Sequence, residues 1–259
     1  MLDATGVALA PAGPPRRVVS LVPSTTEILC ALGLADTLVG ITAYCVEPRD
    51  VVRSKTRVGG TKDPDLEKIR GLAPDLVIAN VEENLRAHVE ALRAWGIPVW
   101  VTYPRTVAEG LGLVRELGEL TGTGARAAQI LGELEPLVER VRLECAARPP
   151  VRVLYPIWRE PYMTIGRDTY VHDVLAVCGG ANVFGDRERY PTVTLEEVAA
   201  RRPEVVLLPD EPFRFRQAHV ADFAAVGARR VLLVDGRPFS WHGPRVAEAL
   251  RTLPALLAG

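Results

Sequence analysis

A repeat within the chain constrains its fold more than any other feature. Residues Asp65–Ala79 align without a gap on Thr194–Leu208, 129 positions further along the chain. Each copy consists of a helix-capping residue, a short amphipathic helix, a proline, an acidic residue and an apolar run of strand length. Asp65 and Thr194 favour helix N-termini, and Thr194 with Glu197 forms a capping box. The repeat therefore predicts two similar halves, each with a helix followed by a buried strand.

Both halves extend this pattern in the same order. A short apolar run opens each half, a helix that ends near a glycine follows, and another apolar run closes it. In the first half, the opening strand is Arg17–Pro23, the helix begins at the expected capping box of Ser24 with Glu27 and ends near Gly33, and the closing strand is Val99–Thr102. In the second half, the opening strand is Arg152–Pro156, the helix begins at about Thr169 and ends near Gly179, and the closing strand is Val231–Val234. Each half is thus predicted as β-α-β-α-β-α-β, which is typical of a parallel sheet covered by helices.

A helical stretch connects the halves. Thr106 with Glu109 forms a further capping box before an apolar helix, and Ala125–Cys145 is rich in helix formers. We therefore expect an α/β fold of two parallel-sheet lobes joined by a long rigid helix, with a ligand cleft between the lobes. The predicted divisions are an N-terminal tail (1–16), an N-terminal lobe (17–104), bridging helices (105–148) and a C-terminal lobe (149–259).

Charge and composition exclude several classes of protein. The 259 residues carry a net charge of −1 and a pI of about 6.5, so we expect no nucleic-acid partner. No apolar run approaches the roughly 20 residues that a spanning helix needs. The tail begins with an acidic residue, contains Pro11, Pro14 and Pro15, and has no cysteine placed for lipidation. It therefore predicts neither a secretory signal nor a lipid anchor, and a cytoplasmic location stays open.

Ligand sites in such sheets lie beyond the carboxyl ends of the strands, so the loops after the strands hold the candidate residues. These loops contain mainly aromatic side chains with a few polar groups, a combination that suits a broad flat ligand with polar edges. The candidates are Tyr44, Cys45, Asn80 and Tyr103 in the first half and Trp158, Arg159, Tyr162, Tyr190, Trp241 and His242 in the second. For Arg159, a ligand carboxylate or phosphate and an ordinary surface position are both open interpretations.

Four stretches together resemble a known family: Val18–Glu27, Leu72–Ile78, Gly166–Phe184 and Trp241–Arg245. They are similar to the helix-bridged substrate-binding proteins of ABC importers, called helical backbone metal receptors, and most similar to the cobalamin-binding members. The resemblance implies a monomeric, extracytoplasmic, non-enzymatic protein without a cofactor of its own. Such a protein captures a corrinoid or related tetrapyrrole and passes it to the membrane subunits of an ABC transporter. Haem and metal-siderophore binding are the alternatives within the same family.

The resemblance also assigns roles to particular residues. Glu67 and Glu196, which are equivalent in the repeat, match the two glutamates that dock onto transporter arginines; the competing interpretation is that both are first-turn acids favoured by the helix dipole. Tyr44, Tyr162 and Tyr190 match aromatic positions beside cobalamin. The sequence departs from the cobalamin pattern at residues 60–62 and at Asn80, where tryptophans are expected, and this leaves the ligand open.

Metal coordination and catalysis have less support. Cys45 as a thiolate or His242 as an imidazole could be an axial ligand, but single residues of these types are more often hydrogen-bonded or packed, so no metal ligand is assigned. The four histidines do not match a zinc site. A doubly wound enzyme using Cys45 or His242 is a further alternative, although the sequence contains no nucleotide-binding or hydrolase motif. A further alternative is an intracellular carrier or sensor of a tetrapyrrole that shares the fold but not the transporter.

Overall fold

The computed structural model describes residues 1–9 and 13–259. Pro11 of the predicted tail lies outside these residues. Contacts divide the chain into two compact units. Unit 1 comprises Met1–Pro104, Gly110–Gly132 and His242–Pro244, and unit 2 comprises Arg105–Glu109, Glu133–Trp241 and Arg245–Gly259. No helix in the described part of the chain is long and apolar enough to cross a membrane.

Unit 1 is built on a parallel sheet in the order β3-β2-β1-β4-β5. Its strands are β1 (Val18–Ser20), β2 (Leu38–Ile41), β3 (Thr56–Arg57), β4 (Leu76–Asn80) and β5 (Val99–Thr102). Its helical segments are α1 (Pro23–Ala31), η1 (Ala35–Thr37), α2 (Arg49–Val52), α3 (Leu66–Gly71) and α4 (Arg86–Ala94). The central strands are fully buried, and their side chains form the core with Ile69 of α3 and Leu92 of α4. Burial on both faces explains the unbroken apolar runs of β1, β4 and β5.

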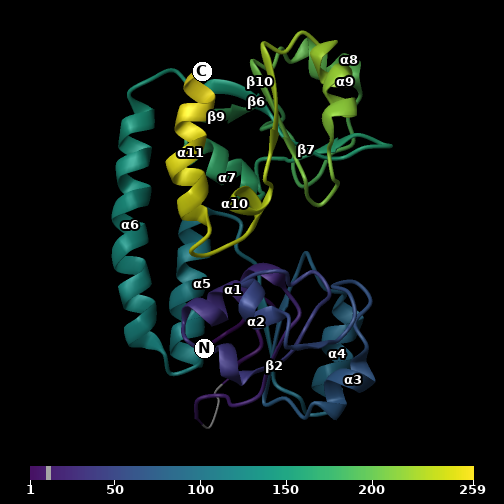
Figure 1. Cartoon of the computed structure of the whole chain (residues 1–259), viewed down its shortest axis with the longest axis vertical. Coiled ribbons are helices and arrows are strands. Elements are labelled where there is room, and N and C mark those ends of the chain that lie inside the picture. The colour runs from purple at the N-terminus through teal and green to yellow at the C-terminus, as the bar shows by residue number, and fades with distance from the viewer. Residues whose placement is uncertain (10–12) are drawn as a thin grey trace. The chain divides into compact units, whose positions relative to one another are not determined.

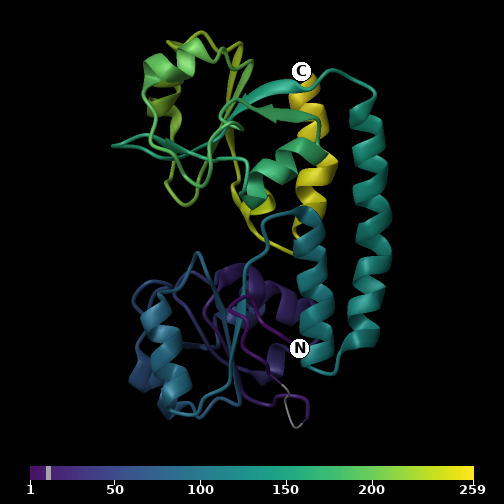
Figure 2. The same ribbon diagram turned by 180° about the vertical axis from the view of Figure 1, so that it is seen from behind.

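Unit 2 has a parallel sheet in the order β11-β10-β6-β9 and a separate antiparallel hairpin, β7-β8. Its strands are β6 (Val151–Leu154), β7 (Pro156–Trp158), β8 (Met163–Thr164), β9 (Gly180–Asn182), β10 (Val205–Pro209) and β11 (Arg230–Val234). Its helical segments are α7 (Tyr170–Val177), α8 (Leu195–Ala200), η2 (Gln217–His219), α9 (Val220–Ala224), α10 (Arg237–Ser240) and α11 (Val246–Ala258). Helices α7 and α11 contact each other and lie side by side in Figures 1 and 2.

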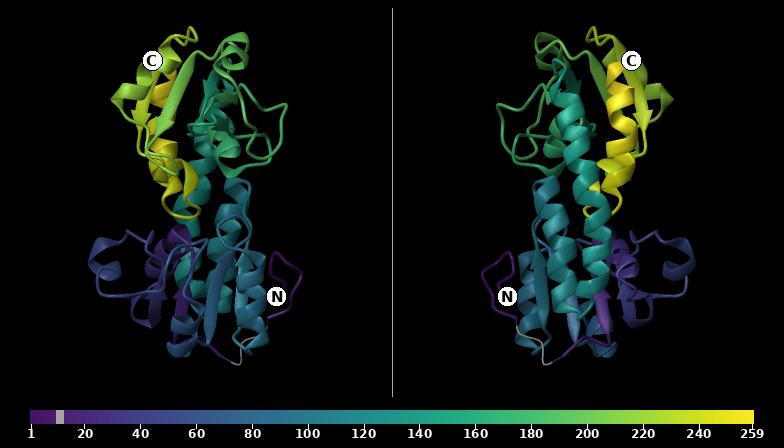
Figure 3. Two further views of the ribbon diagram at one scale, coloured as in Figure 1. Left: turned by 90° about the vertical axis from the view of Figure 1, so that its right-hand side faces the viewer. Right: turned by 90° about the vertical axis from the view of Figure 1, so that its left-hand side faces the viewer.

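Two long helices complete the chain. Helix α5 (Val107–Leu120) and helix α6 (Gly124–Ala146) follow one another through a short turn (Figure 3). Gly118 permits their close approach, because a Cβ there would lie 2.5 Å from the Cβ of Ala127. The continuous helix α6 contributes residues to both units. The prediction of two parallel-sheet α/β lobes joined by a long helix is thus confirmed, whereas the ligand cleft and the lobe boundaries at residues 104 and 148 stay predictions.

The repeat is reproduced residue by residue. Helices α3 and α8 have the same length, as have strands β4 and β10, and all four bounds keep the offset found in the sequence. The residue before each proline is in the left-handed region, with φ of 44° at Ala73 and 47° at Arg202. Asp65 caps α3 through the amide of Lys68, and the Thr194–Glu197 capping box is present at α8. These local signals, which need no tertiary contacts, set where both helices begin and end.

The acidic residue after each proline has a structural role in both units. The carboxylate of Asp75 accepts hydrogen bonds from the backbone amides of Arg16 and Arg17 at 2.8 and 2.9 Å, and that of Glu204 accepts one from Arg152 at 2.9 Å. In return, the guanidinium groups of Arg17 and Arg152 donate to carbonyl groups at the ends of α3 and α8. The opening strand of each sheet is therefore tied to the end of the repeated helix.

Two local expectations were wrong or incomplete. The capping box of Ser24 with Glu27 does not exist, because α1 begins at Pro23 and its N-cap residue Val22 receives no side-chain hydrogen bond. A proline at the first helical position replaces the need for such a cap. The hairpin β7-β8 was not expected, and Trp158 therefore ends a strand instead of lying in an open loop.

Candidate functional site

The loop after β2 holds two candidates with different surroundings. Tyr44 is 62% exposed, whereas Cys45 is fully buried. The Cys45 sulfur accepts a hydrogen bond from the Thr26 hydroxyl at 3.1 Å and lies 3.2 Å from the Thr42 hydroxyl oxygen. Burial raises the pKa of the Cys45 thiol. A neutral, enclosed thiol is a poor metal ligand, so Tyr44 is the residue of this loop that suits ligand contact.

Asn80 organises the loop after β4. Its side-chain amide donates to the hydroxyl of Thr102 at 3.1 Å, and its side-chain carbonyl accepts from the backbone amide of Glu82 at 2.8 Å. Asn80 is 3% exposed, and its hydrogen bonds stabilise the conformation of the loop. The same loop exposes Val81 by 43% and Leu85 by 44%. Sequence reasoning missed these two residues, whose signal was an apolar side chain in a loop directly after a buried strand.

Tyr103 and His242 are the remaining candidates of unit 1. Tyr103 follows β5 and is half-buried. His242 belongs to unit 1 although Trp241 and Arg245 belong to unit 2. Its Nδ1 lies 3.3 Å from the Ser24 hydroxyl oxygen, the side chain is 9% exposed, and burial lowers its pKa to about 4. The imidazole is therefore neutral at pH 7.

The hairpin β7-β8 of unit 2 presents an exposed ring beside a paired arginine. Trp158 is 43% exposed and packs edge-on against Phe213, with ring centroids 5.7 Å apart. The Arg159 Nε donates to Asp222 Oδ2 at 3.2 Å and to the Tyr162 hydroxyl at 3.3 Å, while that hydroxyl donates to Asp222 Oδ2 at 2.6 Å. A ligand anion would compete with Asp222 for Arg159. Trp158 is accordingly the more accessible candidate.

Trp241 is held by a half-buried carboxyl group. Its indole N–H donates to Glu211 Oε1 at 2.7 Å, and the Ser240 hydroxyl donates to the same oxygen at 2.9 Å. Burial raises the pKa of Glu211. Trp241 is 5% exposed and the Arg245 guanidinium lies 5.2 Å from its ring centroid. Tyr190, the last candidate of unit 2, is half-buried, with the Arg189 guanidinium 5.2 Å from its ring centroid.

A hollow of about 520 Å³ lies at the carboxyl ends of β10 and β11 in unit 2. Its volume is within the range of small-molecule sites. It is lined by four apolar, two basic and two acidic residues, namely Leu208, Asp210, Arg214, Phe215, Arg216, Leu233, Val234 and Asp235. None of them was predicted as a site residue. Their signal was the alternation of Phe213 and Phe215 with arginines after the strand.

Glu67 and Glu196 both lie in the first turn of an exposed helix end, as the repeat predicts. The Glu67 side chain is 75% exposed and its Oε2 is 4.0 Å from the Arg70 guanidinium. Glu196 is exposed, and hydrogen bonds from its own backbone amide and the Thr194 hydroxyl lower its pKa. Both positions are sterically open to a partner, and their docking role stays a prediction.

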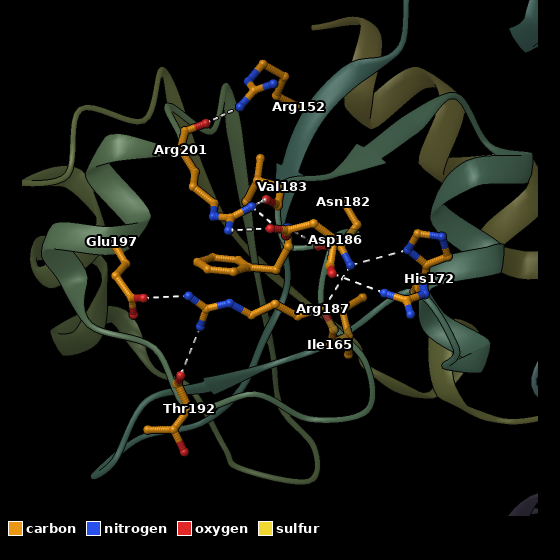
Figure 4. Close-up of polar contacts among 12 residues, drawn as sticks. Arg152, Ile165, His172, Asn182, Val183, Asp186, Arg187, Thr192, Glu197 and Arg201 are labelled. Carbon is orange, nitrogen blue, oxygen red and sulfur yellow. Dashed lines mark hydrogen bonds and ion pairs between the residues drawn. The ribbon is translucent and has the colours of Figure 1, made fainter.

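Glu196 and its neighbour Glu197 have different surroundings, because Glu197 is ion-paired and Glu196 is exposed. Figure 4 shows Glu197 paired with Arg187, at 2.5 Å, and Arg201 paired with both carboxylate oxygens of Asp186, at 2.6 and 2.8 Å. The two arginines stack on the buried Phe184, with guanidinium carbons 5.3 and 4.5 Å from the ring centroid. This network holds Glu197 in place.

The described residues contain no group of three or more His, Cys, Asp or Glu side chains that could hold a metal ion. Cys45 and His242 are both buried, and the expectation that neither is a metal ligand stays a prediction. The ligand-contact roles of all ten candidate residues remain predictions.

Comparison with known proteins places the chain in a family. Residues 18–235 match the family described as periplasmic binding protein. Vitamin B12-binding proteins are similar in sequence: that of Vibrio cholerae is 27% identical over 246 residues, covering 93% of this chain and 89% of the relative, and that of Yersinia pestis is 31% identical over 199 residues, covering 76% and 71%. These relatives are binding proteins, not enzymes.

Solved structures of periplasmic binding proteins share the fold of this chain. The periplasmic vitamin B12 binding protein BtuF of Vibrio cholerae superposes with a TM-score of 0.82 at 26% identity, covering 95% of this chain and 97% of that chain. The periplasmic haem-binding protein BhuT in complex with two haems has the same TM-score and identity, covering 95% and 98%. On the match over residues 18–235 and on this shared fold, the chain belongs to the periplasmic binding protein family.

Proposed function

We propose that this protein captures a corrinoid or a related tetrapyrrole outside the cytoplasm and delivers it to the membrane subunits of an ABC transporter. The exposure of Tyr44 in the loop after β2 and of Trp158 at the end of β7 carries the proposal. Tetrapyrroles offer wide apolar faces, and exposed aromatic rings bind such faces with little loss of side-chain entropy. The protein acts as a monomer, and capture requires no cofactor.

Haem is the second candidate ligand, and the similarity to BhuT favours it as directly as the similarity to BtuF favours cobalamin. A metal-siderophore has no such support here. Because Cys45 and His242 are buried, the proposal includes no protein ligand to the cobalt or iron.

Titration of the purified protein with cobalamin, cobinamide and haemin tests the proposal. At least one of the three is expected to quench tryptophan fluorescence and shift its own visible absorbance with one site per chain and a Kd below about 1 μM. Trp158→Ala should weaken binding about tenfold, because it removes an exposed ring from the contact surface.

The matched control is Trp95→Ala. Trp95 is 38% exposed at the end of α4, where Arg70 stacks on it, and its loss should leave the affinity unchanged. The absence of any spectral change with all three compounds would refute the tetrapyrrole assignment.

A further inference from the structure

We infer that Arg214 and Arg216 form an anion-recognising rim on the 520 Å³ hollow of unit 2, and that they select tetrapyrroles carrying a free anionic group. This inference rests on the proposed function and adds the charge of the ligand to it. The anion is either a propionate carboxylate of a haem-type porphyrin or the nucleotide phosphate of a complete cobalamin.

Apolar side chains line part of the hollow. Leu208 of β10 is fully buried and Phe215 is 4% exposed, whereas Leu233 of the edge strand β11 is 45% exposed. An apolar surface beside two cations suits a molecule with an apolar face and a charged edge.

The two phenylalanines beside Arg214 pack in or against the core, whereas Arg214 and Arg216 are exposed. Phe213 and Phe215 pack together with ring centroids 4.8 Å apart, and Phe215 contacts Phe223 at 6.0 Å. The backbone amide of Phe215 donates to the carbonyl of Pro209 at 3.1 Å. The same amide lies 3.0 Å from the carbonyl oxygen of Phe213, which forms a tight turn at Arg214. Arg214 and Arg216 are both exposed.

The charges around the hollow leave these two cations available. Both oxygens of Asp235 bond Arg237, at 2.9 and 2.6 Å, and Asp210 Oδ1 accepts from the backbone amide of Gly236 at 2.9 Å. Within residues 1–9 and 13–259, no carboxylate lies within ion-pair distance of the Arg214 or Arg216 side chain. The contrast with Arg159, which Asp222 neutralises, makes this pair the better anion site of unit 2.

The chemistry of the guanidinium group defines the ligand class. Its planar fork pairs with the oxygens of a carboxylate or phosphate through two parallel hydrogen bonds. A neutral amide edge offers no such charge-assisted pair. The rim therefore discriminates between tetrapyrroles of similar shape and different charge.

Two ligand pairs test the inference, each with one anionic and one neutral member at the edge. They are haemin with its dimethyl ester, and cobalamin with cobinamide, which lacks the nucleotide phosphate. In the unaltered protein the anionic member of at least one pair is expected to bind about tenfold more tightly or better. The pair that shows this preference identifies whether carboxylate or phosphate is the recognised group.

The variant is Arg214→Gln with Arg216→Gln, which removes both charges and keeps polar side chains of similar length. It should reduce the preference to about onefold, because the affinity for the anionic ligand falls while the affinity for the neutral ligand stays unchanged. The control, Arg140→Gln with Arg142→Gln on α6, removes two exposed charges elsewhere and should keep the preference.

Two results would overturn the inference while leaving the proposed function intact: equal binding of both members of each pair by the unaltered protein, or a preference that survives in the Arg214 and Arg216 variant. If no member of either pair binds the unaltered protein, the proposed function fails and the inference falls with it.

Discussion

Replacing Glu67 and Glu196 together with arginine is expected to reduce transporter-dependent uptake of the ligand more than tenfold, while the affinity for the ligand stays unchanged. Both carboxylates lie exposed in the first turn of equivalent helices, where helix N-termini favour negative charge. If they meet transporter arginines, the variant places like charges opposite each other, which costs several kcal/mol at an interface. Each single variant should show an intermediate loss, because each removes one contact.

Uptake in cells and ligand affinity of the purified variants are the two measurements. Glu133→Arg with Glu144→Arg is the control, since it makes the same change of net charge at exposed positions of α6. Normal uptake by the Glu67 and Glu196 variant would show that these residues are ordinary first-turn acids.

The stability of the protein is expected to fall by roughly 3 kcal/mol between pH 6.5 and pH 4 on account of His242 alone. Burial lowers the pKa of this side chain from 6.5 to about 4. Above pH 6.5 the imidazole is neutral in both states, so it adds no pH dependence. Between these values the unfolded chain binds a proton that the folded chain excludes, and this favours unfolding. Below about pH 4 both states bind the proton and the loss is complete.

Urea unfolding of the protein and of His242→Asn at several pH values measures this effect. Carboxylates with lowered pKa, such as Asp3 and Asp222, also lose stabilising interactions in acid, so the difference between the two proteins is the relevant quantity. That difference should change by roughly 3 kcal/mol across the window. Ser24→Ala is the control, since it keeps the burial that lowers the pKa and should retain the acid dependence. Parallel curves for the protein and His242→Asn would contradict the explanation.

Local signals explain why much of the fold could be predicted from sequence. Asp65 and Thr194 cap their helices, the prolines after them prevent continuation, and the uninterrupted apolar runs leave β4 and β10 no exposed face. The hairpin β7-β8 was not predicted because strands of three and two residues are too short for a periodic pattern.

The candidate site was harder to predict, because exposure depends on tertiary contacts. Cys45 and Trp241 are both expected in loops from the sequence. In the structure Cys45 accepts a hydrogen bond from Thr26, and Trp241 donates one to Glu211, and each partner lies in another segment of the chain. The availability of Arg214 likewise follows from which carboxylates have other partners. By contrast, Tyr44 and Trp158 are exposed, while their contact with a ligand remains a prediction.

Native mass spectrometry of the protein mixed with equimolar cobalamin, cobinamide, haemin and a ferric hydroxamate siderophore tests the central claim most directly. Each adduct is identified by its mass, so the experiment reports ligand class and stoichiometry together. The account predicts a tetrapyrrole adduct with one ligand per chain and no siderophore adduct. A siderophore adduct alone, or a spectrum of unliganded protein only, would contradict it.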